Sequence, residues 1–320
     1  MTLRLQARLA DALASGEFYE AQQLYRTLSF RLTARGQYDE AASLLYNGAT
    51  ALLNEGLHES GGDLACQMVA AQAKSTAEPP SVEFVSRVSA LCRLMKPGSP
   101  EREMLTAKSI ELLKPHQELK QQLHREFGFN YWIERNYSLS QYHFVRSSDA
   151  GYHFGRMLVE YSELGYKSEV DLFLALTVLQ LLCLKKLSPA SVCFYTYTRH
   201  HPSLLRTQAP PYPSNYPLLN FTWLLLMSIR SNWPLSCFQY LCQVYRAPLD
   251  RDPICGEYLI KISQLFFGVP AEKTDQSGGF FGSIMRMLAT DDAALDAEDA
   301  EGSDPGANHN AVSLKADDMD

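Results

Sequence analysis

The chain has 320 residues, 46% of them hydrophobic, which is enough apolar surface for a large buried core without disulfides or a structural metal. Its formal charge of −7 is unevenly distributed, because residues 291–320 hold ten acidic side chains and one lysine and leave the preceding part at +2. A nearly neutral body without a stripe of lysine and arginine argues against sequence-independent nucleic-acid binding, which depends on neutralising phosphates.

A short unit near the start of the chain indicates a helical repeat. Residues 16–21 (GEFYEA) recur twenty residues later as 36–41 (GQYDEA), and each copy opens a helix-length apolar pattern. The glycine permits a tight turn, the aromatic residue fills the gap between neighbouring helices, and the alanine lets backbones approach. Repeats of this kind build solenoids, which mostly bind other proteins.

Apolar residues at positions i, i+3, i+4 and i+7 predict amphipathic helices along most of the chain. In the second helix Ala21, Leu24, Tyr25, Leu28 and Leu32 share one face, while Gln22, Arg26 and Thr33 lie on the other. Short breaks between segments predict about fifteen helices of roughly 10 to 18 residues, and no convincing strand pattern is present. We therefore predict an all-α, TPR-like solenoid of stacked antiparallel hairpins.

The most apolar segments, 170–184 and 218–229, are shorter than the ~20 residues that a membrane span needs, so we predict core helices in a soluble protein. Residues 202–217 contain five prolines and predict an irregular loop. Residues 280–288 predict an amphipathic helix that docks either on its own body or on a partner. The acidic segment 291–320 lacks aromatic residues and predicts a disordered tail.

The search for catalytic chemistry is mostly negative. The sequence has no phosphate-binding glycine loop, no zinc-protease motif and no nucleophile elbow. The seven cysteines are interpreted as reduced core residues of a cytosolic protein, with a redox pair of Cys237 and Cys242 as the alternative. His143 with Asp149, and His200 with His201, are interpreted as structural. No catalytic, metal or cofactor site is predicted.

Several stretches of the chain resemble the Golgi-to-ER traffic protein 4 family, a subunit of the transmembrane-domain recognition complex. The similarity lies in the first repeat with the following Tyr25–Leu28, and in the turn Pro97–Arg102. It continues in the segments Leu158–Ser162, Ser168–Asp171, Leu181–Lys185 and Gln264–Pro270, which resemble the animal branch. The resemblance covers about residues 4 to 290, leaving the acidic tail unmatched in detail.

The resemblance implies a function, because members of this family are cytosolic adaptors in the targeting of tail-anchored membrane proteins to the ER. They bridge a dimeric targeting ATPase to a chaperone module and tune the ATPase without being enzymes. By this resemblance residues 1–150 form the ATPase-facing half and residues 151–290 the half that faces the chaperone scaffold. The scaffold is a large BAG-domain protein in animals, and fungal members hold a ubiquitin-like adaptor.

The same resemblance assigns individual residues. Phe18 and Tyr19 match an aromatic pair that faces the ATPase, and Arg26 and Arg31 match basic positions on the same helix. Asp63 aligns with an acidic residue implicated in regulating the ATPase. The residues alone leave an alternative open for three of these positions. In these alternatives Tyr19 packs within the repeat, Arg26 lies on a solvated face, and Asp63 is a negative charge that interacts favourably with the dipole at the N-terminus of the fourth helix.

The C-terminal half departs from the fungal members, which carry a β-hairpin where this chain has the proline-rich segment 202–217. Proline lacks the donor that a β-ladder needs, so the animal mode of gripping a BAG-domain scaffold fits better. Aromatic residues often anchor interfaces. The predicted contacts are therefore aromatic, with core packing as the alternative for most of them: Trp223, Tyr240, Tyr245, Tyr258, Phe266 and Phe267.

Three other functions remain as alternatives to the adaptor. An enzyme built around His143 or His200 and His201 requires a buried polar pocket with perturbed titratable groups. An RNA-binding helical repeat requires a basic concave face, which the near-neutral body disfavours. A scaffold for a different assembly needs none of the assigned residues.

Overall fold

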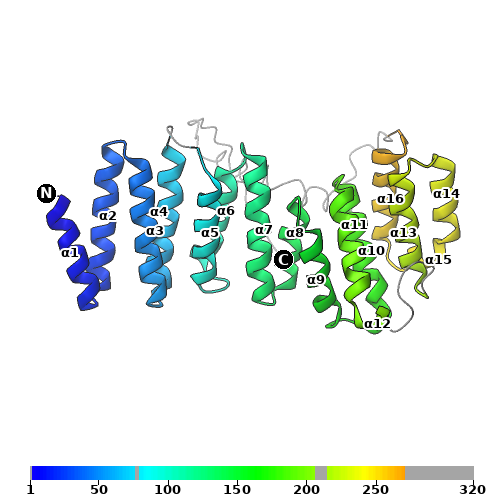
Figure 1. The fold of residues 1–320 in the computed structure, drawn as a ribbon, viewed down its shortest axis with the longest axis horizontal. Helices are drawn as coiled ribbons and strands as arrows, with labels where there is room; N and C mark the ends of the chain where they lie inside the picture. The colour runs from blue at the N-terminus through cyan, green and yellow to red at the C-terminus, as the bar shows by residue number, and fades with distance from the viewer. Residues whose placement is uncertain (1, 76–78, 206–214, 271–320) are drawn as a thin grey trace, which may run out of the picture. The chain divides into compact units, whose positions relative to one another are not determined.

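The regular secondary structure in the described part of the chain is entirely helical. The computed structural model describes residues 2–75, 79–205 and 215–270, and within these ranges it contains sixteen α-helices, one 3-10 helix and no strand (Figure 1). The predicted all-α solenoid is confirmed. None of the helices in these ranges combines the length and the apolar character that crossing a bilayer requires.

Most of the helices have between 10 and 17 residues, and two have only four. In chain order they are α1 (Thr2–Ser15), α2 (Phe18–Ala34), α3 (Tyr38–Asn54), α4 (His58–Lys74), α5 (Val82–Leu94), α6 (Pro100–Leu112), α7 (Gln117–Ile133), α8 (Tyr137–Arg146), α9 (Gly151–Ser162), η1 (Lys167–Glu169), α10 (Val170–Cys183), α11 (Leu187–His200), α12 (Pro202–Leu205), α13 (Pro217–Arg230), α14 (Leu235–Val244), α15 (Arg246–Leu249) and α16 (Ile254–Phe266).

The helices pack in the order in which they occur. Sequential pairs such as α1 with α2, α3 with α4, and α7 with α8 form antiparallel hairpins, which Figure 1 shows side by side. In the N-terminal half alternate helices are also in contact, so α2, α4 and α6 form one layer and α3, α5 and α7 form another. This pairing is the architecture of an α-solenoid, in which each repeat buries its apolar face against its neighbours. Helices α1 to α16 fall within one compact unit, Met1–Ala271.

Glycine turns end the first three helices at a regular interval. Gly16, Gly36 and Gly56 all adopt the left-handed conformation, with φ angles of 75°, 76° and 77°. The residue after each glycine donates a backbone hydrogen bond to a carbonyl five residues earlier, which is the Schellman motif. Arg135 and Lys185 adopt the same conformation without being glycine and end α7 and α10 with the same hydrogen bond. The turn geometry therefore recurs where the sequence unit does not.

The predicted apolar face of α2 is confirmed, with one exception on its polar face. Ala21, Leu24, Tyr25 and Leu28 are buried, and Gly48 of α3 lies so close to the ring of Tyr25 that a Cβ atom there would come within 2.8 Å of it. The exception is Gln22, which was expected among exposed polar residues and is buried. Its amide group is occupied by side chains of α4, as described below.

Helices α10 and α13 are core helices, as predicted for segments 170–184 and 218–229. Helix α10 contacts α9, α11, α13 and α16, and its buried residues are distributed around its whole circumference. Asp171 is buried on this helix because Arg251 donates two hydrogen bonds to its carboxylate, at 3.0 and 2.8 Å. The ion pair ties the start of α10 to the turn before α16.

A second ion pair connects α6 and α7. The guanidinium of Arg102, 1% exposed, donates to both carboxylate oxygens of Glu134 at 2.9 and 2.7 Å. Its Nε lies 3.2 Å from Sγ of Cys92 in α5, and the group lies 4.8 Å from the centre of the Tyr131 ring. Burial alone lowers the pKa of Arg102, but the hydrogen bonds that it donates to Glu134, together with the nearby Cys92, raise its pKa above the usual value.

Three sequence expectations fall wholly or partly outside the described residues. Within the proline-rich segment, 202–205 form the short helix α12 in place of the expected loop, and 206–214 are not described. The expected helix 280–288 and the acidic segment 291–320 also lie outside the described residues. The expected boundary at residue 150 falls between α8 and α9, which contact each other, and the division into two functional halves stays a prediction.

Candidate partner-binding surfaces

Asp63 in α4 is the centre of a hydrogen-bond cluster that links α4 to α2. Arg26 donates to its Oδ2 atom from Nε at 3.0 Å, and its Nη2 atom lies 2.8 Å from the same oxygen in an ion pair. Gln67, one turn further along α4, donates to the same oxygen at 2.8 Å, and Gln22 lies 3.5 Å from it. Ser60 donates to the amide oxygen of Gln22 at 3.1 Å. Two of the residues assigned separately from the sequence, Arg26 and Asp63, thus form one ion pair.

This geometry bears on the alternatives left open for these two residues. Helix α4 begins at His58, so Asp63 lies in its second turn, and Glu59 is the acidic residue of the first turn. The interpretation of Asp63 as a charge that answers the helix dipole is therefore wrong, because the dipole acts within the first turn. Arg26 is exposed, as the solvated-face alternative expects, and its guanidinium is paired with Asp63.

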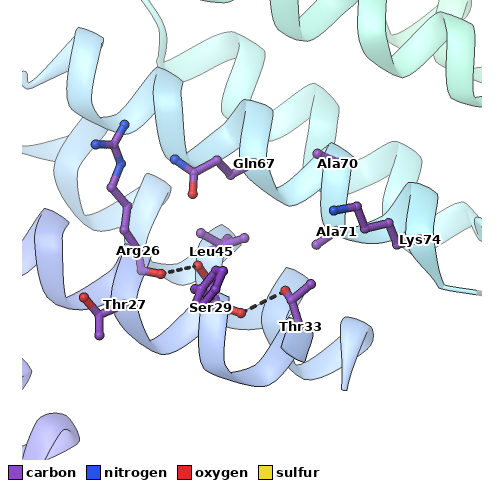
Figure 2. Close-up of a pocket in the computed structure, with 10 residues that line it drawn as sticks. Arg26, Thr27, Ser29, Thr33, Leu45, Gln67, Ala70, Ala71 and Lys74 are labelled. Atoms are coloured by element: carbon purple, nitrogen blue, oxygen red, sulfur yellow. Dashed lines mark hydrogen bonds between the residues drawn. The ribbon is translucent and has the colours of Figure 1, made fainter. Parts of the chain in front are cut away.

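A groove of about 510 Å³ lies beside the ion pair, between α2 and α4 and over Leu45 of α3. Figure 2 shows Arg26 and Gln67 at one end of it, with Lys74 on the same helix as Gln67. We call it the N-terminal groove, and its lining residues are Arg26, Thr27, Ser29, Phe30, Thr33, Leu45, Gln67, Ala70, Ala71 and Lys74. Phe30 is 75% exposed, which is unusual for so large an apolar side chain.

The two aromatic residues at the start of α2 have different environments. Phe18 is half-buried and packs against the hydrophobic core, whereas Tyr19 is 78% exposed. Packing within the repeat therefore describes Phe18 and is wrong for Tyr19. Tyr19 and Arg26 are seven residues apart and share one face of α2. Arg31 is half-buried and is not among the residues that line the N-terminal groove.

A second groove lies between α13 and α14, and we call it the C-terminal groove. It measures about 490 Å³, and its lining residues include no acidic or basic side chain: Leu224, Trp233, Ser236, Cys237, Tyr240, Leu241, Val244 and Tyr245. Tyr240 is 69% exposed, and Trp233 and Val244 are also exposed. A concave apolar surface with exposed aromatic residues is suited to an apolar partner segment.

The six aromatic residues predicted as contacts in the C-terminal half have different environments in the structure. Tyr240 and Tyr245 line the C-terminal groove together. Tyr258 is only 4% exposed, and burial raises its pKa to about 12, so this residue belongs to the core. Phe267 stacks on Phe238 of α14 at 4.5 Å between ring centres. The remaining two, Phe266 and Trp223, are half-buried and do not line this groove.

Sequence reasoning missed Trp233 and Val244 in this groove, and it placed Cys237 in the core. Cys237 is exposed, whereas Cys66, Cys92, Cys183, Cys193 and Cys255 are buried as predicted. All seven cysteines are free, and burial raises the pKa of Cys242 to about 11, which disfavours a thiolate at neutral pH. The sequence did contain a signal for an exposed Trp233, because this residue lies in the turn Ser231–Pro234, directly before the proline at the start of α14.

The histidines singled out in the sequence lie in packed surroundings. Nδ1 of His143 is 2.9 Å from Nδ1 of His124 in the interior between α7 and α8. Asp149 pairs with Arg125, and His200 contacts the carbonyl of Thr196 on its own helix at 2.7 Å. Among the described residues no three His, Cys, Asp or Glu side chains are grouped as a metal site requires. None of these histidines lines either groove.

Comparisons with known proteins agree with the resemblance seen in the sequence. A family model described as Golgi to ER traffic protein 4 matches residues 35–288. Golgi to ER traffic protein 4 homolog A of Xenopus laevis is 39% identical over 301 residues, which cover 93% of this chain and 90% of that protein. The Homo sapiens homolog is 38% identical over 306 residues, with the same coverage. A crystal structure of C. therm. Get4 matches with a TM-score of 0.76 and 22% identity over 95% of this chain and 99% of that one, which supports the fold.

Proposed function

The chain belongs to the Golgi to ER traffic protein 4 family, and we propose that it is a cytosolic adaptor that delivers tail-anchored membrane proteins toward the ER. In this role it joins a targeting ATPase to a BAG-domain chaperone scaffold and tunes the ATPase. The observation that carries the proposal is the presence of two exposed surfaces of different chemistry on one array of helices.

The ATPase binds to the surface around the N-terminal groove. Tyr19 and Phe30 supply exposed aromatic area on α2, and Arg26 and Asp63 supply charges of both signs beside them. Aromatic and arginine side chains are enriched among the residues that dominate binding energies. Asp63 acts on turnover more than on affinity, as the resemblance implies for the acidic residue that it matches.

The chaperone scaffold binds to the C-terminal groove through an apolar segment. With no acidic or basic side chain in the lining, a partner gains by burying apolar area and not by pairing charges. Tyr240 and Val244 are the anchors on this side. The ubiquitin-like adaptor either binds this chain directly or is attached to it through the scaffold. Pull-down of the adaptor with and without the scaffold distinguishes the two.

The ATPase surface is tested by calorimetry with and without ATP. The double variant Tyr19→Ala with Arg26→Glu should abolish nucleotide-dependent binding. A matched control is Tyr166→Ala with Arg246→Glu, because both side chains are strongly exposed and lie outside both grooves. Equal losses in the two double variants would contradict the assignment. Asp63→Ala should alter ATPase turnover while the complex still forms, and unchanged turnover would remove the regulatory role.

The scaffold surface is tested in the same way with a charge placed in the apolar groove. Val244→Asp should weaken scaffold binding by at least about tenfold, because it buries a carboxylate without a partner. Ile133→Asp is the matched control, since Ile133 is exposed and lies on α7, away from the groove's lining residues. Binding at this groove should change little between low and high salt, whereas binding at the charged N-terminal surface should weaken.

A further inference from the structure

The two oxygens of the Asp63 carboxylate are not equivalent. Every hydrogen bond to this carboxylate among the described residues ends on Oδ2, from Arg26, Gln67 and Gln22. Oδ1 accepts none of them, and it is not among the buried polar atoms that lack a partner, so it reaches solvent. The side chain as a whole is 34% exposed.

This one-sided arrangement fixes where the second oxygen points. An ionised carboxylate accepts about four hydrogen bonds, shared between its two oxygens. When three side chains hold one oxygen, rotation of the planar group is restricted and Oδ1 keeps a single direction. Arg26 contacts Oδ2 through Nε and Nη2, and its third nitrogen, Nη1, takes no part in this contact.

We propose, on the basis of the function proposed above, that Gln67 is a positioning residue of the regulatory site. Gln67 holds Oδ2 of Asp63, and Gln22, itself bonded by Ser60, contacts the same oxygen. This leaves Oδ1 to bind an ammonium or guanidinium group of the ATPase. The partner's cation completes a row of alternating charges, in which Asp63 lies between Arg26 and the incoming group.

Gln67 is suited to this role for reasons that do not apply to Arg26. Its amide is neutral, so it orients the carboxylate without changing the net charge that the partner meets. It lies four residues after Asp63 on the same helix, where side chains are neighbours on one face, and its 2.8 Å bond needs no second element to move. Gln22 and Ser60 extend the support to the contact between α2 and α4.

The first experiment measures ATPase turnover and affinity in four chains: wild type, Gln67→Leu, Asp63→Asn and the double variant. Gln67→Leu should reduce the Asp63-dependent change in turnover by at least about tenfold, the factor for one hydrogen bond to a charged group. Affinity should stay within about twofold. In the Asp63→Asn background Gln67→Leu should have no further effect, because a positioning residue acts only through its target. Gln23→Leu on α2 is the matched control.

An equal effect of Gln67→Leu in both backgrounds, or no effect in either, overturns the proposal. A second measurement on the free chain separates this outcome from failure of the proposed function. In a nitrogen-15 correlation spectrum, Asp63→Asn should shift the side-chain amide signal of Gln67 and leave that of Gln23 in place. If the amide shifts but the wild-type chain does not bind the ATPase, the proposed function fails and the contact stands. An unmoved Gln67 signal refutes the positioning role whether or not the ATPase binds.

Discussion

The buried pair of Arg102 and Glu134 should respond very differently to the loss of one partner or the other. Glu134→Ala leaves a guanidinium that is 1% exposed without its carboxylate, next to only a thiol and an aromatic ring. Arg102→Met leaves a carboxylate whose side chain is 20% exposed and that can turn toward water. The first change should therefore be the more destabilising.

The structure sets the size of this difference. Removing one partner of a buried pair costs about 3–5 kcal/mol when the remaining charge stays buried. Glu134→Ala belongs to that class, whereas Arg102→Met keeps most of the packing and should cost about 1–2 kcal/mol. Replacing both, as Arg102→Met with Glu134→Leu, should resemble Arg102→Met alone, because no unpaired charge then remains.

Urea unfolding followed by circular dichroism measures these differences, and Glu83→Ala serves as the control. Glu83 pairs with Arg87 one turn away, and its side chain is 70% exposed, so its loss should cost less than about 0.5 kcal/mol. If Arg102→Met is as destabilising as Glu134→Ala, the reasoning from burial is refuted. The same holds if the double variant is the least stable of the three.

Other consequences of the packing are open to direct measurement. Gly128→Ala places a Cβ atom 2.6 Å from the ring of Phe144 and should cost about 1–3 kcal/mol, and an unchanged urea midpoint would contradict the tight contact. Burial, together with the charges of Arg146, Lys120 and Lys186, lowers the pKa of His124 to about 3. Between pH 6.5 and pH 3 the unfolded chain therefore binds more protons than the folded chain. The free energy of unfolding should decrease as the pH is lowered through this range, by at most about 1.4 kcal/mol per pH unit. His124→Asn should flatten this part of a pH–stability profile, and an identical slope would count against it. Tyr258→Ala should cost about 3–5 kcal/mol while Tyr240→Ala costs under about 0.5, and similar melting points for the two variants would reverse their assignment to core and surface.

Helical periodicity was sufficient to predict the fold because each helix buries a continuous face. The apolar positions of α2 and the mostly apolar segment of α10 followed directly from spacing and length. The turns between the helices could be predicted only in part. Gly16 and Gly36 marked two of them, but Arg135 and Lys185 adopt the same left-handed conformation without the residue type that usually signals it.

The candidate sites were predicted less well than the fold because their geometry depends on contacts between helices. Nothing in the spacing of Arg26 and Asp63 indicates that they meet, since the contact requires α2 and α4 to be neighbours in one layer. Periodicity also cannot distinguish a buried aromatic residue from an exposed one when both lie in apolar helices. That limit separates Tyr258, which is core, from Tyr240, which lines the C-terminal groove.

The central claim is that one chain holds two partners at once through two separate surfaces. The most direct test mixes the chain with the targeting ATPase and the BAG-domain scaffold and measures the mass of the complexes by analytical ultracentrifugation. The account predicts a complex that contains all three proteins. It also predicts that Tyr19→Ala with Arg26→Glu releases only the ATPase, and that Val244→Asp releases only the scaffold. Mutually exclusive binding of the two partners, or loss of both through either variant, would contradict it.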